Sequence, residues 1–354
     1  MTYFMQSKLL KIGLFLSVSF VFSCAKTQTD VPVENNTYKP TPYVLQIPAG
    51  FPEYNVLSIA NPLTVEGIAL GKSFYSDPIL STNGRSCTTC HIQSNSFSRP
   101  IYNAQNGYAI SVPPHVNLAF KKNYNWTGSE LNLDTLAMGD FAPEFFNSDS
   151  AILYAALTNH PFYKDAFYKA FLIKDIYSLS FIQLQKKIAY SIAQFLRTKV
   201  SVNSKYDQLQ VGTARYTDEE WEGYNIFFTE KGDCFHCHQP PLFSDNEFHN
   251  NGVSATFEGF DAGRWLVSNN KADIGKFATP TLRNLVFTAP YMHDGRFKTL
   301  EEVVEFYNSG VNYSPTIDPI SSKKAPSYKL NLSTQQKASL VAFLKTLTDD
   351  SYVK

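Results

Sequence analysis

The sequence has no net charge, because its 31 Lys and Arg residues balance 31 Asp and Glu residues. Without a basic field to attract nucleic acid or anionic lipid, no nucleic-acid partner is expected. Cysteine is also scarce, with five residues in 354. Four of the five form two C-x-x-C pairs and the fifth, Cys24, ends an apolar segment, so none is left over for a disulfide. In an exported protein, such paired thiols are usually committed to another bond.

The apolar segment near the start is too short to span a bilayer. Residues 12–22 follow two lysines and number eleven, whereas a spanning helix needs about 20 apolar residues. Ser23 before Cys24 resembles a lipoprotein signal, in which the cysteine is acylated. We therefore predict a lipoprotein-type signal peptide at 1–24 with a lipid anchor at Cys24, and a flexible polar tether at 25–50. The alternative is an ordinary cleaved signal with an incidental cysteine.

The rest of the chain has little strand-type alternation and reads as mainly α. Apolar residues recur every three or four positions between 181 and 195, and Ser333 with Gln336 is a capping pair for a last helix. The segments 92–150 and 239–298 are predicted to be long connecting loops, which are usually functional in a compact domain.

The chain also repeats one plan. A Thr-x-Glu sequence, an apolar stretch and a C-x-x-C-H motif follow each other in both halves. The second copy begins with Thr217 and Glu220, which form a capping box. We expect a helix before each motif, and two domains at 51–210 and 211–354.

The C-x-x-C-H motifs carry the chemistry. In each, two thiols three positions apart can form thioethers with a porphyrin, and the following imidazole can bind its iron. The alternative is a zinc or redox C-x-x-C pair, which two copies in an exported protein make remote. Two covalent haem c groups are therefore predicted, held by the following residues: Cys87, Cys90, His91, Cys234, Cys237 and His238.

The flanks of these motifs resemble the bacterial di-haem cytochrome c peroxidases and the related MauG enzymes. The resemblance rests on the following segments: Asn61-Pro62-Leu63-Thr64, Asp77-Pro78-Ile79-Leu80-Ser81, Phe248-His249-Asn250 and Ala289-Pro290-Tyr291-Met292-His293-Asp294-Gly295. It implies two cytochrome c-like domains, each with one covalent haem. The N-terminal haem would meet hydrogen peroxide, and the C-terminal haem would collect electrons.

The resemblance also implies catalytic residues. By its place in Asn125-Trp126-Thr127-Gly128, Trp126 resembles the residue that passes electrons between the haems; a buried core tryptophan is the alternative. Glu144, in Ala142-Pro143-Glu144-Phe145, best resembles the family's glutamate, which moves a proton between the peroxide oxygens. The spacing around Glu144 is one residue short, and an exposed loop glutamate is the alternative.

Two departures concern the iron ligands. The helix at 299–307 has no Met where the better-known peroxidases place the second ligand of the C-terminal iron. It resembles the MauG branch, in which Tyr307 would take that place, with Met292 as the rival and a plain core tyrosine as the alternative. No His lies between His91 and His115, so the first haem is either open, as in MauG, or reached by His115.

The family's calcium ion would be held by residues resembling Asn117, Thr288 and Pro290, through amide and carbonyl oxygens.

Three functions follow from these features. The first is a peroxidase that reduces hydrogen peroxide with electrons from a small periplasmic donor such as cytochrome c. The second is a MauG-like oxidase of a protein or small-molecule substrate. The third is a di-haem electron carrier without catalysis. The peroxidase is preferred, because nothing in the sequence identifies a substrate protein. The expected location is the periplasm or cell envelope, with the protein as an outer-membrane lipoprotein.

Overall fold

The computed structural model describes residues 38–52, 60–103, 109–322 and 329–354. The predicted signal peptide at 1–24, its anchor at Cys24 and the first half of the predicted tether, residues 25–37, lie outside these residues. The last part of the tether differs from the prediction. Tyr43 donates a backbone hydrogen bond to Leu63, Val65 donates one to Thr41, and Leu45 is buried in an apolar cluster. Residues 41–45 therefore belong to the folded chain.

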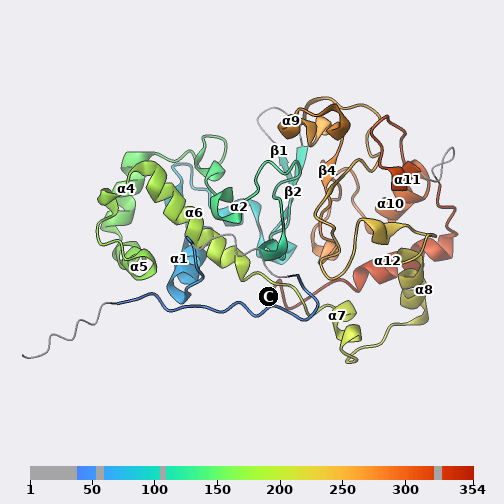
Figure 1. The fold of residues 1–354 in the computed structure, drawn as a ribbon, viewed down its shortest axis with the longest axis horizontal. Helices are drawn as coiled ribbons and strands as arrows, with labels where there is room; N and C mark the ends of the chain where they lie inside the picture. The colour runs from blue at the N-terminus through green and yellow to red at the C-terminus, as the bar shows by residue number, and fades with distance from the viewer. Residues whose placement is uncertain (1–37, 53–59, 104–108, 323–328) are drawn as a thin grey trace, which may run out of the picture. The chain divides into compact units, whose positions relative to one another are not determined.

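Helices dominate both halves, as predicted (Figure 1). The N-terminal half contains the following helices: α1 (Val65–Ser76), α2 (Cys87–Cys90), α3 (Leu133–Leu136), α4 (Ser150–Asn159), α5 (Pro161–Phe171) and α6 (Phe181–Arg197). The C-terminal half contains these: α7 (Lys205–Gln210), α8 (Asp218–Phe227), α9 (Trp265–Ser268), α10 (Leu300–Glu305), α11 (Pro319–Ser322) and α12 (Thr334–Lys345). Among the described residues, no helix is long and apolar enough to cross a membrane.

Local sequence signals correctly located three helices, two by their capping pairs and one by its apolar repeat. Thr217 with Glu220 forms the box that starts α8, and Ser333 with Gln336 forms the one that starts α12. The apolar repeat between 181 and 195 is α6. The predicted long loops are less irregular than expected, because each contains a two-stranded antiparallel sheet. β1 (Arg99–Asn103) pairs with β2 (Ala109–Val112), and β3 (Phe248–His249) pairs with β4 (Phe277–Ala278).

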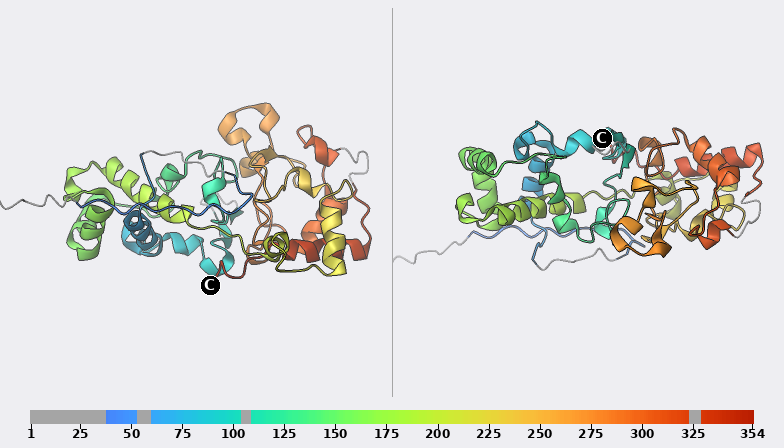
Figure 2. Two further views of the ribbon diagram at one scale, coloured as in Figure 1. Left: turned by 60° about the horizontal axis from the view of Figure 1, so that its bottom comes forward. Right: turned by 90° about the horizontal axis from the view of Figure 1, so that it is seen from above.

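Each half is built on one pair of crossed helices with a glycine at the crossing. α1 packs on α6 and α8 packs on α12, as the views in Figures 1 and 2 agree. A Cβ on Gly71 would lie 1.8 Å from the backbone oxygen of Ser191, and one on Gly223 would lie 1.9 Å from that of Ser339. Real atoms cannot approach so closely, so only glycine allows these backbones to touch. Because α1 and α8 precede the two C-x-x-C-H motifs, the crossings position both motifs.

The two halves bury separate cores. Fully buried side chains of the first core, such as Phe74 and Phe167, come from residues 70–196. Those of the second core, such as Phe227 and Phe343, come from residues 206–347. These two cores support a two-domain organisation, while the predicted boundary between residues 210 and 211 stays a prediction.

The internal repeat extends well beyond the haem motifs. Asn117 and Asn284 both adopt the left-handed conformation, and each begins a short 3-10 turn. Seven residues later, Tyr124 donates to the backbone oxygen of Leu118 at 3.1 Å, as Tyr291 does to that of Leu285. The tyrosines each form an isolated bridge to the residue six positions on. Residues 117–128 therefore correspond to residues 284–295, one for one.

Candidate functional site: two haem-binding motifs

The first C-x-x-C-H motif is held by a helix of a single turn. Ser86 caps α2 in a capping box with Thr89, and Cys87 and Cys90 lie at the two ends of that helix. Neither is in a disulfide. His91 follows directly, and its Nδ1 lies 2.9 Å from the backbone oxygen of Phe97. With Nδ1 donating to this carbonyl, the lone pair of Nε2 is left for a metal, as in other metal-binding histidines.

The second motif repeats this arrangement. Cys234 starts a 3-10 turn, Cys237 ends it, and neither is in a disulfide. The Nδ1 of His238 lies 2.9 Å from the backbone oxygen of Phe243. Phe97 and Phe243 both adopt the left-handed conformation, which turns each carbonyl back toward its histidine. Both histidines are thus oriented by the backbone in the same way.

The electrostatics of both motifs suit covalent haem. Burial lowers the pKa of His91 to about 4 and also lowers the pKa of His238, so both imidazoles are neutral and can donate a lone pair. Burial raises the pKa of the Cys234 thiol to about 12, and raises that of Cys87. These are protonated thiols in apolar surroundings, unlike the activated thiolates of redox C-x-x-C pairs. The donor set therefore fits haem c at both motifs.

His115 lies against the first motif. Its ring stacks on that of His91, with centroids 3.6 Å apart and planes 18° apart, and its Nδ1 lies 3.0 Å from the hydroxyl of Tyr75. The predicted alternative, in which His115 reaches the iron, would need this ring to leave the face of His91. In the described arrangement, His115 is a neighbour of the iron-binding imidazole.

Trp126 lies where residues of both halves meet. Its Nε1 donates to the backbone oxygen of Ser111 at 2.7 Å, and its own backbone oxygen accepts from Ala278 at 2.8 Å. Ser111 in turn donates its N–H to the backbone oxygen of His293 at 2.8 Å. In the internal repeat, Trp126 corresponds to His293.

Glu144 differs in its surroundings from Asp140, a nearby carboxylate that the sequence did not single out. The side chain of Glu144 is exposed, and its backbone oxygen accepts from Arg85 at 2.9 Å. Asp140, four residues earlier in the sequence, is partly buried, and its sequence neighbours Ala137 and Phe141 belong to the same apolar core as Cys87. Burial raises the pKa of Asp140 to about 7, and its charge raises the pKa values of Cys87 and Tyr75. Asp140 is thus the carboxyl group coupled to the first motif.

Tyr307 and Met292, the two predicted ligands of the second iron, meet at one amide. The Nδ2 of Asn251 donates to the hydroxyl of Tyr307 at 2.9 Å and lies 3.6 Å from the sulfur of Met292. Burial raises the pKa of Tyr307 to about 12, and the nearby Cys237 and Cys234 add to the rise. Tyr307 does not continue α10 as predicted, because a π-turn, Phe306–Gly310, begins just before it. Such turns are frequent at functional sites.

Comparisons with known proteins agree with this geometry. The profile of a family described as di-haem cytochrome c peroxidase matches residues 65–215. Cytochrome-c peroxidase IdrP2 of Denitromonas iodatirespirans is 31% identical over 339 residues, covering 85% of this chain and 86% of that protein. Methylamine utilization protein MauG of Methylorubrum extorquens is 32% identical over 297 residues, covering 81% and 80%. The chain belongs to the di-haem cytochrome c peroxidase and MauG family.

A solved structure supports the same assignment. A MauG-like protein associated with microbial copper homeostasis superposes with a TM-score of 0.77 at 28% identity, covering 88% of this chain and 97% of that one. The chain is therefore a cytochrome-c-peroxidase-family oxidoreductase with two cytochrome c-like domains. Two haem c groups are the cofactors of this family, and both motifs fit them.

Asn117, one of the predicted calcium ligands, uses its side-chain amide for hydrogen bonds within the protein. The side-chain oxygen of Asn117 accepts from the backbone N–H of Ser201 at 2.8 Å, and its Nδ2 donates to the oxygen of the same residue at 3.2 Å. Its counterpart Asn284 accepts from the N–H of Asp349 at 2.8 Å. The two asparagines thus tie equivalent turns to the chain. The hydroxyl of Thr288 donates to Leu285, and this geometry gives no independent support for calcium.

One histidine beside the second motif is held between two carboxylates. Nε2 of His249 lies 2.8 Å from Asp245, and Nδ1 lies 2.6 Å from Asp318. These two hydrogen bonds raise the pKa of His249 to about 12, so the imidazole is a cation. The sequence resemblance included His249 but gave no sign of its partner Asp318, which lies 69 residues away.

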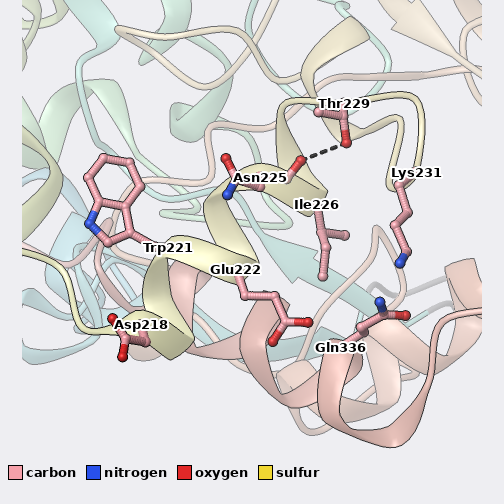
Figure 3. Close-up of a pocket in the computed structure, with 8 residues that line it drawn as sticks. All are labelled: Asp218, Trp221, Glu222, Asn225, Ile226, Thr229, Lys231 and Gln336. Atoms are coloured by element: carbon pink, nitrogen blue, oxygen red, sulfur yellow. Dashed lines mark hydrogen bonds between the residues drawn. The ribbon is translucent and has the colours of Figure 1, made fainter.

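An open pocket in the second half is unrelated to the haem motifs. It lies along α8 and reaches Gln336 at the start of α12, as Figure 3 shows. Trp221 and Glu222 line it, and Glu222 accepts a hydrogen bond from Ser339 at 2.7 Å. The pocket contains no cysteine or histidine, so it supplies no soft metal ligand.

Proposed function

We propose that the protein is a di-haem c-type peroxidase that reduces hydrogen peroxide to water with electrons from a small periplasmic donor such as cytochrome c. The observation that carries the proposal is the matched pair of C-x-x-C-H motifs. Each has a neutral imidazole whose Nδ1 is fixed by a backbone carbonyl, at 2.9 Å in both His91 and His238. Haem bound at both motifs supplies a peroxide-binding iron and a store of electrons.

At the first haem, Asp140 is proposed to move the proton. Peroxide reduction needs a base that takes a proton from one oxygen and returns it to the other, so that water leaves. Burial places the pKa of Asp140 at about 7, which suits both steps near neutral pH. Glu144, the residue predicted from the sequence, is exposed and stays the rival. Stacking of His115 on His91 favours a first haem whose far face is open to peroxide.

At the second motif, Tyr307 is proposed as the residue that would hold the iron together with His238. A phenolate ligand favours ferric iron and lowers the reduction potential relative to a thioether. Asn251 donates to the phenol oxygen at 2.9 Å and would orient it. Met292, at 3.6 Å from the same amide, remains the rival.

Between the two halves, Trp126 is proposed to pass electrons. Its indole is fixed by the hydrogen bond to Ser111, and its backbone bonds directly to Ala278 of the second half. An indole held in one orientation at this junction can accept and release an electron without moving.

A second function is supported by Tyr307 and by the relatives. Several of the similar proteins are named MauG. In a MauG-like oxidase, the electrons would come from a protein or small-molecule substrate. A non-catalytic electron carrier is less well supported, because such a carrier gives no role to the proton transfer that is proposed for Asp140.

The remaining proposals concern location and calcium. Export to the periplasm, with an outer-membrane lipid anchor at Cys24, is proposed from the sequence of the first 24 residues. One calcium ion at Asn117, Thr288 and Pro290 is proposed only from the resemblance to the family.

The test is a turnover assay on holoprotein with both haems attached. Reduced cytochrome c should be oxidised at many turnovers per second when peroxide is added. Slow turnover with a long-lived oxidised state would favour the MauG-like function. If both irons are six-coordinate and do not react with peroxide, the protein is an electron carrier without catalysis.

A further inference from the structure

The internal repeat provides a comparison within one molecule. Phe97 and Phe243 are equivalent, since each carbonyl accepts from the iron-binding histidine of its own half. The ring of Tyr75 lies 6.1 Å from that of Phe97 at 68°, and the ring of Phe227 lies 6.1 Å from that of Phe243 at 66°. Tyr75 and Phe227 therefore occupy equivalent places on α1 and α8.

A second pair is equivalent by its backbone. His115 donates its N–H to the oxygen of Phe97 at 3.2 Å, and Leu282 donates to that of Phe243 at 3.3 Å. His115 precedes Asn117 by two residues, as Leu282 precedes Asn284. The second half thus has phenylalanine and leucine where the first half has tyrosine and histidine. Packing alone is satisfied by the apolar pair, so the polar pair needs another explanation.

The polar pair forms a continuous path to the iron-binding imidazole. Tyr75 is 2% exposed, and its hydroxyl lies 3.0 Å from Nδ1 of His115. The ring of His115 stacks on that of His91 at 3.6 Å. The backbone of His115 is fixed as well, because its oxygen accepts from the hydroxyl of Tyr352. A phenol bonded to a fixed nitrogen base can lose an electron and a proton together, which leaves the ring radical neutral and moves the positive charge to the base.

We propose that Tyr75 and His115 form a redox site of the first haem, in which Tyr75 supplies one electron during peroxide reduction. Reduction of one hydrogen peroxide to two waters takes two electrons and two protons. Tyr75 gives one electron through His115 and His91, and the other comes from iron. The O–H bond of Tyr75 breaks and an N–H bond forms at Nδ1 of His115, which carries its resting proton on Nε2. Tyr75 is left as a neutral radical, His115 as a cation, and the two protons consumed come from solvent.

The Tyr75–His115 site depends on the proposed peroxidase function. It gives the enzyme a second place, besides the iron, that can hold an oxidising equivalent. When the donor is absent or slow, Tyr75 would hold one oxidising equivalent as its radical. Two donor electrons would restore the resting state, one for Tyr75 and one for the iron, and the proton would return from His115 to Tyr75. The second half, with Phe227 and Leu282, lacks such a site.

The experiment is electron paramagnetic resonance on fully ferric holoprotein, frozen at intervals after stoichiometric peroxide is added without donor. We expect a tyrosyl radical, identified by the change in its hyperfine pattern with ring-deuterated tyrosine. Tyr75→Phe should abolish it, and because this change copies Phe227, folding should be kept. His115→Leu copies Leu282 and should lower the radical yield several-fold. Tyr352→Phe, which keeps the Tyr75 hydroxyl and its base, should retain the signal.

Three results would overturn the redox site: no tyrosyl signal in the wild type, an unchanged signal in Tyr75→Phe, or an unchanged yield in His115→Leu. Haem content and the ferric spectrum of each variant check that both haems are in place. A wild type that oxidises cytochrome c but shows no radical rejects this site alone. A holoprotein that does not consume peroxide rejects the peroxidase function and the redox site together.

Discussion

Trp126 and His293 are joined through a single residue, Ser111. The oxygen of Ser111 accepts from the indole of Trp126, while its N–H donates to the backbone oxygen of His293. The two joined residues are counterparts in the internal repeat, one from each half. His293 is itself fixed by a 2.8 Å hydrogen bond to Asp261 and by stacking on Phe277 at 3.8 Å. The indole is thus held in a rigid frame, as an electron-transfer residue requires.

The first prediction follows from this frame. Trp126→Phe keeps an aromatic ring but removes the bond to Ser111 and raises the energy needed for oxidation. We expect peroxide-driven oxidation of cytochrome c to slow roughly tenfold or more, about 1.4 kcal/mol of barrier. The rate of peroxide binding, measured by stopped flow, should not change. If turnover is unaffected, Trp126 is a core residue.

The second prediction separates two carboxylates. Asp140→Asn removes the proposed base and should lower kcat/KM for peroxide by about 100-fold. In the wild type, kcat/KM should rise as pH passes upward through about 7, because the carboxylate form of Asp140, whose pKa is about 7, is the active one. The variant should lack this rise. Glu144→Gln is the matched control and should change kcat/KM little. If Glu144→Gln lowers kcat/KM more than Asp140→Asn does, Glu144 is the proton-transfer residue.

The third prediction concerns the second iron. Tyr307→Phe should raise the reduction potential of one haem by on the order of 100 mV, since a phenolate favours the ferric state. Its charge-transfer absorption should be lost as well. Met292→Leu removes the rival sulfur and should leave both properties unchanged. A shift in Met292→Leu alone would assign the ligand to methionine.

The fourth prediction is a pH dependence of stability. His249→Gln removes the cation between Asp245 and Asp318 and should cost about 3 kcal/mol near pH 6. The pKa of His249 is raised from 6.5 to about 12, so its contribution is full below pH 6.5 and falls as pH rises above it. The pKa values of both carboxyls are lowered from 3.8, so their contribution is lost as pH falls below that value.

Denaturant unfolding of the wild type and His249→Gln over pH 3 to 10 measures this difference. The difference in free energy of unfolding between the two proteins should be widest between pH 3.8 and pH 6.5. It should become smaller at lower and at higher pH. A constant gap would mean that the substitution acts through packing rather than charge.

The fifth prediction concerns the helix crossings. Gly71→Ala and Gly223→Ala each place a methyl group less than 2 Å from a backbone oxygen. Each should destabilise its own domain by about 3 kcal/mol and lower haem incorporation at the adjoining motif. Gly139→Ala is the control, because nothing lies within 4 Å of its added Cβ. Thermal unfolding and haem content measure the effect.

Local signals in the sequence were sufficient for much of the fold. The capping pairs at Thr217 and Ser333 involve neighbours three residues apart, so α8 and α12 could be located without tertiary information. The C-x-x-C-H motifs are equally local. The π-turn at Tyr307 was missed, because a widened turn has the same apolar spacing as a regular helix over a few residues.

Contacts over long sequence separations could not be predicted. Asp140 stands in a loop sequence with no special pattern, and its raised pKa comes from its burial in the folded chain. The stacking of His115 on His91 depends on a turn that the chain makes between them. The match of 117–128 to 284–295 was available in the sequence, as Asn and Tyr seven residues apart in both halves.

Tyr352 closes the surroundings of the first haem from a position 237 residues beyond His115. Tyr352 can pack here only after the first motif and nearly all of the remaining chain have been made. Cys87, which is 7% exposed once the chain is folded, is more accessible in the unfolded chain than in the folded one. Attachment of a cofactor at the first motif is therefore easier before Tyr352 docks than after it.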